Sequence, residues 1–130
     1  KNSFALISYR IISEQPAIEG KVASAIVKIR VNGATKIAAA DGEGPVHAMD
    51  LALRAALSDF YPEIARMSLV DFKVRVLDSD KATAAKVRVL ITSADSADSW
   101  TTVGVSEDVI EASWIALTDS IDYALMRRER

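Results

Sequence analysis

The stretch AIVKIRVNGATKIAA, residues 25–39, decides the fold, because it holds two strands and the turn that joins them. Apolar side chains occupy every second position from Ala25 to Val31, which is the period of a strand with one buried face. Asn32-Gly33 then favours a two-residue hairpin turn with positive φ, and residues 35–39 return as the next strand. The sequence therefore predicts an antiparallel hairpin here.

One more strand precedes this hairpin and a helix follows it. In residues 6–11, Ile7, Tyr9 and Ile11 alternate with polar side chains, so a third strand is expected. The helix is expected to begin at Pro45, whose missing N–H is not needed at the first helical position. One stripe of this helix is apolar and is expected to be buried: Val46, Met49, Leu53, Leu57 and Phe60.

The same order of elements recurs with a period of roughly 64 residues, which indicates a duplicated supersecondary unit. Three pairs of segments correspond in the same order: 6–11 with 69–74, 25–31 with 85–91, and 46–57 with 110–121. The sequence therefore predicts an α+β fold with a duplicated βββα unit, antiparallel strands and two helices on one face. We expect a single domain over residues 1–130, with its internal repeat at 1–65 and 66–130.

In the second copy, residues 70–76 and 85–91 alternate in the manner of half-buried strands. Its hairpin connection is expected to be longer and more polar, at residues 93–99. Ser106 is the predicted N-cap of the second helix, followed by two acidic residues that favour the helix dipole. The buried stripe of that helix is expected to be Ile110, Trp114, Leu117, Ile121 and Leu125.

Composition limits the possible functions. The 130 residues are 50% hydrophobic, and 16 Lys and Arg residues against 18 Asp and Glu residues give a net charge of −2. This balance argues against a nucleic-acid-binding module, which normally has a basic face. The sequence has no apolar run long enough to cross a bilayer, and no signal peptide is expected. The lack of Cys favours the cytoplasm. The single His, His47, excludes any metal site built on two or three His ligands.

A candidate binding site lies at Asp41-Gly42-Glu43-Gly44-Pro45, where a strand meets the first helix. Backbone N–H groups at the start of a helix collect anions. A dinucleotide fingerprint is rejected, because His47 stands where Gly or Ala is required and no parallel βαβ unit surrounds it. The matching junction in the second copy, residues 102–106, again places small residues before a helix. Two such helix starts favour a small carboxylate ligand, and tight turns that bind nothing are the alternative.

Other conspicuous residues receive structural interpretations. His47 is expected to be a solvated surface residue. Asp95 and Asp98 are expected on a solvated loop, because the spacing of a calcium-binding EF-hand is absent. Trp100 and Trp114 are expected in the core or at an interface. The scattered carboxylates show no acid–base pair with catalytic spacing.

Two motifs resemble the C-terminal regulatory domain of the 2-isopropylmalate synthase family. The first is DGEGPVHA, residues 41–48, with Ala52-Leu53, and the second is WTTVGVSEDVIEASW, residues 100–114. The run FKVRVLD, residues 72–78, followed by Thr83-Ala84-Ala85, is most similar to the citramalate synthase branch. The resemblance covers nearly the whole chain.

This resemblance implies a doubled βββα domain that pairs with a second copy and binds the pathway's end-product amino acid near the dimer contact. The effector is isoleucine in the citramalate branch and leucine in the isopropylmalate branch. The parent enzymes transfer an acetyl group from acetyl-CoA to a 2-keto acid, which is pyruvate in the citramalate case. They use a divalent metal on an N-terminal (β/α)8 barrel. The chain is therefore expected to have no catalytic residues and no cofactor of its own, and to feedback-inhibit the barrel of its parent chain.

The residues and the resemblance together suggest how isoleucine is held. N–H groups of residues 42–46 and 104–106 meet the carboxylate, and Asp41 is the nearest acid for the ammonium group. The branched tail needs a dry pocket, for which the resemblance suggests Tyr61 and Ile64. Val103 and Val105, in the second half of the internal repeat, are expected to line the same pocket. The predicted effector-binding residues are Ala40, Asp41, Gly42, Gly44, Pro45, Tyr61, Ile64, Val103, Gly104 and Val105.

Three hypotheses stay open: an isoleucine-binding domain of a citramalate synthase, a leucine-binding domain of an isopropylmalate or related synthase, and a dimerisation domain without effector binding. The placement of one methyl group separates isoleucine from leucine, which a pocket discriminates by only about 1–3 kcal/mol. A homodimer is expected, because strand positions such as Ile26 and Leu90 leave apolar surface for a partner. No nucleic-acid or membrane partner is expected.

Overall fold

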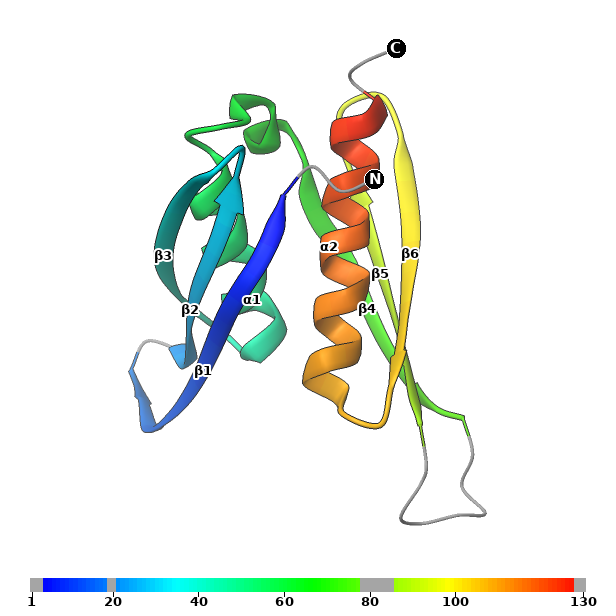
Figure 1. The fold of residues 1–130 in the computed structure, drawn as a ribbon. Helices are drawn as coiled ribbons and strands as arrows, with labels where there is room; N and C mark the ends of the chain where they lie inside the picture. Colours follow the sequence, from blue (N-terminus) through cyan, green and yellow to red (C-terminus); the bar gives the residue numbers. More distant parts are fainter. Residues whose placement is uncertain (1–3, 19–20, 78–85, 128–130) are drawn as a thin grey trace. The chain divides into compact units, whose positions relative to one another are not determined.

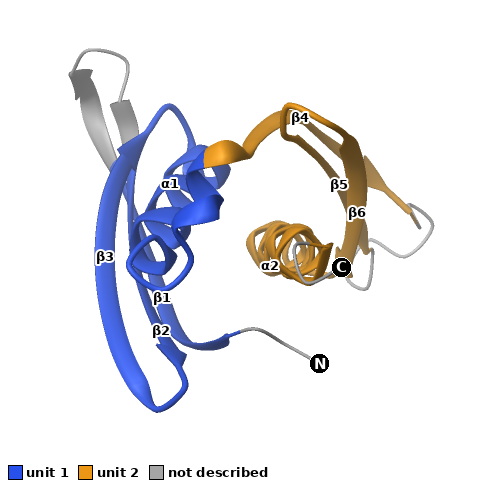
Figure 2. Ribbon diagram, turned by 90° about the horizontal axis from the view of Figure 1, so that it is seen from above, with its two compact units in different colours: residues 1–65 blue, residues 66–130 orange. Residues whose placement is uncertain are grey.

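The computed structural model describes residues 4–18, 21–77 and 86–127. The chain divides into two compact units, residues 1–65 and 66–130, which Figure 2 colours separately. Each unit contains a three-stranded antiparallel sheet followed by a helix that lies on one face of that sheet (Figures 1 and 2). The predicted α+β fold with a duplicated βββα unit is confirmed.

Unit 1 begins with three strands in the order β1-β2-β3. They are β1 (Ala5–Ile18), β2 (Lys21–Val31) and β3 (Ala34–Gly42). The helix α1 (Pro45–Leu57) packs mainly on β2 and β3, and a short 3-10 helix, η1 (Pro62–Arg66), follows it. We call the face of a sheet that is turned away from its own helix the outer face.

The core of unit 1 follows from the alternation along β2 and the stripe along α1. Nine side chains from these two elements are fully buried: Ala25, Val27, Ile29, Ala48, Met49, Ala52, Leu53, Ala56 and Leu57. Each of the larger ones stabilises the fold by about 1.5–3 kcal/mol through removal from water. Phe60, predicted to end the helical stripe, lies instead in the turn after α1, because the helix ends at Leu57.

The hairpin between β2 and β3 is the one predicted. Asn32 has φ 51° and Gly33 has φ 85°, so both turn residues adopt the left-handed conformation that a type I′ turn requires. The strands then pair without interruption from Val31↔Ala34 to Ala23↔Gly42. In this register β3 ends at Gly42, three residues before α1 begins at Pro45.

Unit 2 repeats the arrangement with β4 (Ser68–Val76), β5 (Val87–Ala94), β6 (Ser99–Ser106) and α2 (Val109–Arg127). The sheet order is β4-β5-β6, and α2 packs on β5 and β6. Ala85, predicted to begin the middle strand, lies outside the described residues.

The predicted helical stripe of unit 2 is buried as expected at four of its positions, and Ile110 is partly exposed. The core side chains of this unit include Val89, Ile91, Trp114, Leu117, Ile121 and Leu125. Trp100 is also buried, so both tryptophans belong to the core of unit 2, as predicted.

Two local predictions for unit 2 are wrong. The β5–β6 connection is shorter than expected and comprises residues 95–98, because the strands extend to Ala94 and from Ser99. The N-cap of α2 is Asp108 and not Ser106: Asp108 Oδ1 accepts a hydrogen bond from the Ile110 N–H at 2.9 Å. Both errors arise because short polar side chains favour turns and caps equally.

β1 and β4 share an irregularity that the alternating pattern does not reveal. The pairing of β1 with β2 shifts register at Ile7, and the pairing of β4 with β5 shifts at Val70. The residues just before them, Leu6 and Leu69, keep their partners, whereas Ile7 and Val70 are exposed. The expectation that Ile7 and Val70 continue the alternation is therefore wrong, because a β-bulge inserts one extra residue.

β4 leaves an apolar strip open. Phe72, Val74 and Val76 lie opposite Ile91, Val89 and Val87 on the helix side of the sheet. Because α2 covers β5 and β6, these three β4 side chains are 37%, 42% and 62% exposed. We call Phe72, Val74 and Val76 the β4 strip.

Candidate functional site

The predicted effector residues up to Ile64 belong to unit 1, and Val103, Gly104 and Val105 belong to unit 2. In unit 1 the structure gathers Ala40, Asp41, Gly42, Gly44 and Pro45 at the junction of β3 and α1. In unit 2 the three residues lie on β6. The two groups therefore offer different local chemistry.

The start of α1 has open donors. Gly44 is its N-cap, with extended backbone (φ −162°), and its carbonyl accepts the Ala48 N–H at 3.0 Å. No side chain caps this end of the helix, and no acidic residue lies in its first turn. Since the first N–H groups of a helix lack intrahelical acceptors, this end can receive a carboxylate.

His47, in the first turn of α1, forms a hydrogen bond with the loop that precedes the helix. Its Nδ1 accepts a hydrogen bond from the Glu43 N–H at 3.1 Å, while the side chain stays exposed. The residue is at the surface, as predicted, but it also ties the loop before α1 to the first helical turn. This contact holds the Gly44 region in place.

Asp41 projects from the outer face of the unit 1 sheet. It pairs with Ser24 across β2 and β3, and its Oδ1 accepts a hydrogen bond from the Ser24 hydroxyl at 2.6 Å. Ala40 and Gly42, its neighbours, lie on the helix side. Asp41 is exposed and is the second-to-last residue of β3, so its carboxylate is available at the end of the strand.

Gly42 is explained by packing. A Cβ at this position would lie 2.4 Å from the Ala48 nitrogen, so only glycine lets β3 approach α1 this closely. Gly44 is different, since a Cβ placed there meets no atom within 4 Å beyond the adjoining residues of the chain. The space beside Gly44 is therefore the open part of the junction.

Tyr61 and Ile64 lie just beyond α1. Tyr61 is partly exposed, and its N–H donates to the Leu57 carbonyl at 2.8 Å. Ile64, on η1, is 1% exposed. Ile64 therefore belongs to the core of unit 1, and Tyr61 offers more accessible surface.

The β6 residues have a different setting. Gly104 faces α2, and a Cβ there would lie 2.0 Å from the Ala112 carbonyl oxygen. Val103 and Val105 lie on the outer face and are 45% and 41% exposed. Within unit 2 these two valines are open to solvent and enclose no dry pocket.

The start of α2 also differs from that of α1, because the chain's own side chains occupy it. Ser106 Oγ accepts the Asp108 N–H at 3.1 Å and donates to Glu111 Oε1 at 2.7 Å. Asp108 supplies the cap, and Glu111 places a carboxylate in the first turn. A ligand carboxylate would therefore meet two resident acids at α2 and none at the equivalent places of α1.

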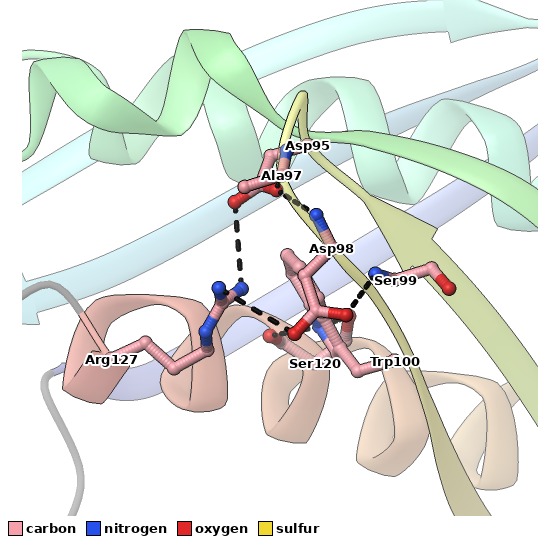
Figure 3. Close-up of polar contacts among 7 residues, drawn as sticks. All are labelled: Asp95, Ala97, Asp98, Ser99, Trp100, Ser120 and Arg127. Atoms are coloured by element: carbon pink, nitrogen blue, oxygen red, sulfur yellow. Dashed lines mark hydrogen bonds and ion pairs between the residues drawn. The ribbon is translucent and has the colours of Figure 1, made fainter.

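A polar cluster at the other end of α2 was not predicted. Arg127, in the last turn, lies 3.5 Å from Asp95 Oδ2 and 3.6 Å from Asp98 Oδ2 (Figure 3). Its guanidinium group also lies over the rings of Trp100 and Tyr123. Asp95 and Asp98 do lie on a largely exposed turn, as predicted, but their ion pairs with Arg127 were not expected. The sequence signal for these ion pairs was an Asp at each end of a short turn, together with an Arg near the end of the following helix.

Asp95 also builds the β5–β6 turn. Its Oδ1 accepts the N–H groups of Ala97 and Asp98 at 2.9 and 2.8 Å. These backbone hydrogen bonds, with a smaller contribution from Arg127, hold the pKa of the Asp95 carboxyl below its usual range. The cluster therefore joins the β5–β6 turn to the C-terminal end of α2.

Asp50 on α1 is a buried acid that the sequence analysis missed. Burial raises the pKa of Asp50, and Arg54, 3.1 Å away one helical turn on, partly offsets that shift. A charged pair at i and i+4 on an otherwise apolar stripe was the available signal.

Within the described ranges, no group of three His, Asp or Glu side chains is arranged to hold a metal ion. Among the helices described, none is long and apolar enough to span a membrane.

The family model of the LeuA allosteric (dimerisation) domain matches residues 1–125, so the chain belongs to this family of regulatory domains. The chain is 47% identical to the (R)-citramalate synthase of Aquifex aeolicus over 130 residues, which are 99% of the chain and 25% of that protein. It is 48% identical to the (R)-citramalate synthase of Synechocystis sp. over 113 residues, 87% of the chain and 20% of that protein.

The 2-isopropylmalate synthase of Aquifex aeolicus is 29% identical over 111 residues, 85% of the chain and 20% of that protein. The predicted resemblance to the family, and to the citramalate branch in particular, is confirmed. The chain spans about a quarter of the length of the citramalate synthases that it matches over most of its own length.

Proposed function

We propose that this chain is the allosteric domain of a citramalate synthase and that it binds isoleucine to feedback-inhibit the parent enzyme. The observation that carries this proposal is the contrast in identity within one organism: 47% to the citramalate synthase of Aquifex aeolicus and 29% to its 2-isopropylmalate synthase. Acetyl-CoA, pyruvate and a divalent metal belong, in this proposal, to the remaining part of the parent chain in the cytoplasm.

The start of α1 is the proposed carboxylate site. Its open N–H groups and the space beside Gly44 support this choice, whereas the start of α2 is already occupied by Asp108 and Glu111. The effector's ammonium group is proposed to bind Asp41 at the end of β3. Tyr61 offers apolar surface for the branched tail.

A second copy of the chain is the proposed partner. The family is named for dimerisation as well as for allostery. The β4 strip supports this, because three neighbouring apolar side chains at an open sheet edge favour burial against a partner. Ile26 and Leu90, the strand positions predicted to make this contact, are partly buried.

Calorimetric titration of residues 1–130 with isoleucine, leucine, valine and threonine in parallel tests the proposal. We expect isoleucine to bind most tightly. Tighter binding of leucine would favour the isopropylmalate type of regulation, and a domain that is folded and dimeric but binds none of the four would be a dimerisation module alone. Removing residues 1–130 from the parent enzyme should abolish its inhibition by isoleucine.

A further inference from the structure

The outer face of unit 2 carries a group of cations, of which Lys73 alone has an ion-pair partner among the described residues. Lys73 and Arg75 on β4, and Arg88 on β5, alternate with the side chains that face α2. Arg75 and Arg88 lie directly opposite each other on adjacent strands. We call the set of outer-face residues Lys73, Arg75, Arg88, Leu90, Val103 and Val105 the basic face.

The charge on this face is opposite in sign to the net charge of the chain, which is −2. Asp71 is the acid beside it in the described part of the chain, and it lies 3.8 Å from Lys73. No ion pair reaches Arg75 or Arg88 among the described residues. Like charges directly opposite on a sheet are destabilising, so this arrangement costs stability unless an acidic partner covers it.

The surroundings indicate what kind of partner fits. Val105 lies opposite Arg88, and Leu90 lies between Lys73 and Val103, so aliphatic side chains alternate with the cations across three strands. Arginine among apolar side chains is typical of a protein–protein interface. The aliphatic side chains on these three strands add apolar surface that a small inorganic anion would leave uncovered.

The equivalent face of unit 1 lacks the central feature. There Arg10 lies opposite Ile26, and Lys28 lies opposite Ser8 and Ile37, so no two cations face each other. The paired arginines are therefore particular to unit 2 and do not follow from the repeated fold.

We propose that the basic face docks an acidic, partly apolar surface on the remaining part of the synthase polypeptide. This inference rests on the proposed function, because it takes the chain to be about a quarter of a longer synthase, as its relatives are. A covalently joined partner has a high effective concentration, so even a modest interface stays occupied. Carboxylates bind arginine with two parallel hydrogen bonds, which removes the repulsion between Arg75 and Arg88.

The test uses the full-length synthase and a zero-length carbodiimide cross-linker, which joins an amine to a carboxylate in direct contact. We expect Lys73 to be linked to an Asp or Glu outside residues 1–130. The double variant Arg75→Glu, Arg88→Glu keeps the Lys73 amine but reverses the charge of the basic face. It should lower the yield of this link by about tenfold or more, because like-charge contacts cost several kcal/mol. The matched control Arg10→Glu, Lys28→Glu makes the same charge change in unit 1 and should leave the yield unchanged.

Several results would overturn the proposal. Links from Lys73 only to residues of the same domain would mean that no other part of the polypeptide covers the basic face. Links to residues 1–130 of a second copy would assign it to the dimer contact. Thermal stabilisation by inorganic phosphate, lost in Arg75→Glu, Arg88→Glu and accompanied by no link to the rest of the chain, would make it an anion site.

Calorimetry on the same preparations separates this inference from the proposed function. If the link forms but isoleucine does not bind, the docking surface stands and isoleucine regulation fails. If isoleucine binds but no link forms, the proposed function stands and the docking surface fails. Circular dichroism melting of both double variants shows whether the units remain folded.

Discussion

Asp41 has two competing roles that a single carboxylate-to-amide change separates. As a structural residue it accepts the Ser24 hydroxyl, and as an effector ligand it meets an ammonium group. Asp41→Asn keeps an oxygen that accepts from Ser24 and removes only the charge. We expect little change in Tm, and a loss of isoleucine affinity of about thirtyfold, the effect of removing one member of a charge pair worth about 2 kcal/mol.

Ser24→Ala is the matched control for Asp41, because it removes the hydrogen bond and keeps the charge. It should leave isoleucine affinity within a few-fold of the wild type. Unchanged affinity in Asp41→Asn with an intact fold would remove Asp41 from the site, and backbone carbonyls near Ala40 would become the acceptors of the ammonium group.

Asp95 should make stability depend on pH in the acid range. Its pKa is lowered in the folded state, so its charged form stabilises the fold above the ordinary Asp pKa of about 4, and this stabilisation is lost as pH falls through the folded value. Asp95→Asn should therefore melt below the wild type at neutral pH, and the difference in Tm should shrink below about pH 4.

Arg127→Gln tests the cause of that pH dependence. The backbone N–H groups of Ala97 and Asp98 contribute more to the shift than the arginine does. The variant should therefore melt at a lower temperature but keep most of the acid dependence of the wild type. A profile as flat as that of Asp95→Asn would instead make Arg127 the main partner of the carboxylate.

At the scale of the elements, the approach of β6 to α2 should depend on one missing side chain. Gly104→Ala would place a Cβ 2.0 Å from the Ala112 carbonyl oxygen and 2.9 Å from the Ala116 nitrogen, so the strand or the helix must move. We expect a loss of about 1–3 kcal/mol or more in the free energy of unfolding, which chemical denaturation measures.

Gly44→Ala is the matched control for that loss. Its backbone is extended, and the added Cβ meets no atom within 4 Å beyond the adjoining residues of the chain. The cost should therefore stay below about 1 kcal/mol, that of a weaker N-cap. Equal losses in the two variants would show that the close approach at Gly104 does not limit stability.

The elements themselves could be predicted because their signals are periodic. Alternation from Ala25 to Val31, the Asn32-Gly33 turn and the stripe of α2 each repeat a geometric requirement of the structure that they form. The bulges at Ile7 and Val70 could not be predicted in this way, since an inserted residue leaves the composition of a strand unchanged.

The backbone of the candidate site could be predicted from the sequence, but the directions in which its side chains project could not. The helix start after Gly44 follows from local sequence, but the face on which Asp41 and Val103 project depends on strand register. The contacts of Arg127 with Asp95 and Asp98 join residues far apart in sequence, so they need the folded unit to be seen.

For the whole molecule, we expect residues 1–130 to form a homodimer with twice the mass of the 14.1 kDa chain. Val76 is the most exposed residue of the β4 strip at 62%, and Val76→Glu should shift the equilibrium toward the monomer because it places a charge in the buried contact. Ile37→Glu, at a position 58% exposed on β3, should leave the dimer intact. Light scattering at tens of micromolar protein distinguishes these outcomes, and a wild-type mass near that of one chain would contradict the dimer.

The strand pairings described here join neighbours along the chain: β1 with β2, β2 with β3, β4 with β5, and β5 with β6. Few residues separate the partners, so little chain entropy is lost when each loop closes, and the relative contact order of a unit is low for a protein rich in strands. Each βββα unit is therefore expected to reach its native topology quickly during synthesis. Its sheet can form as soon as one hairpin has nucleated.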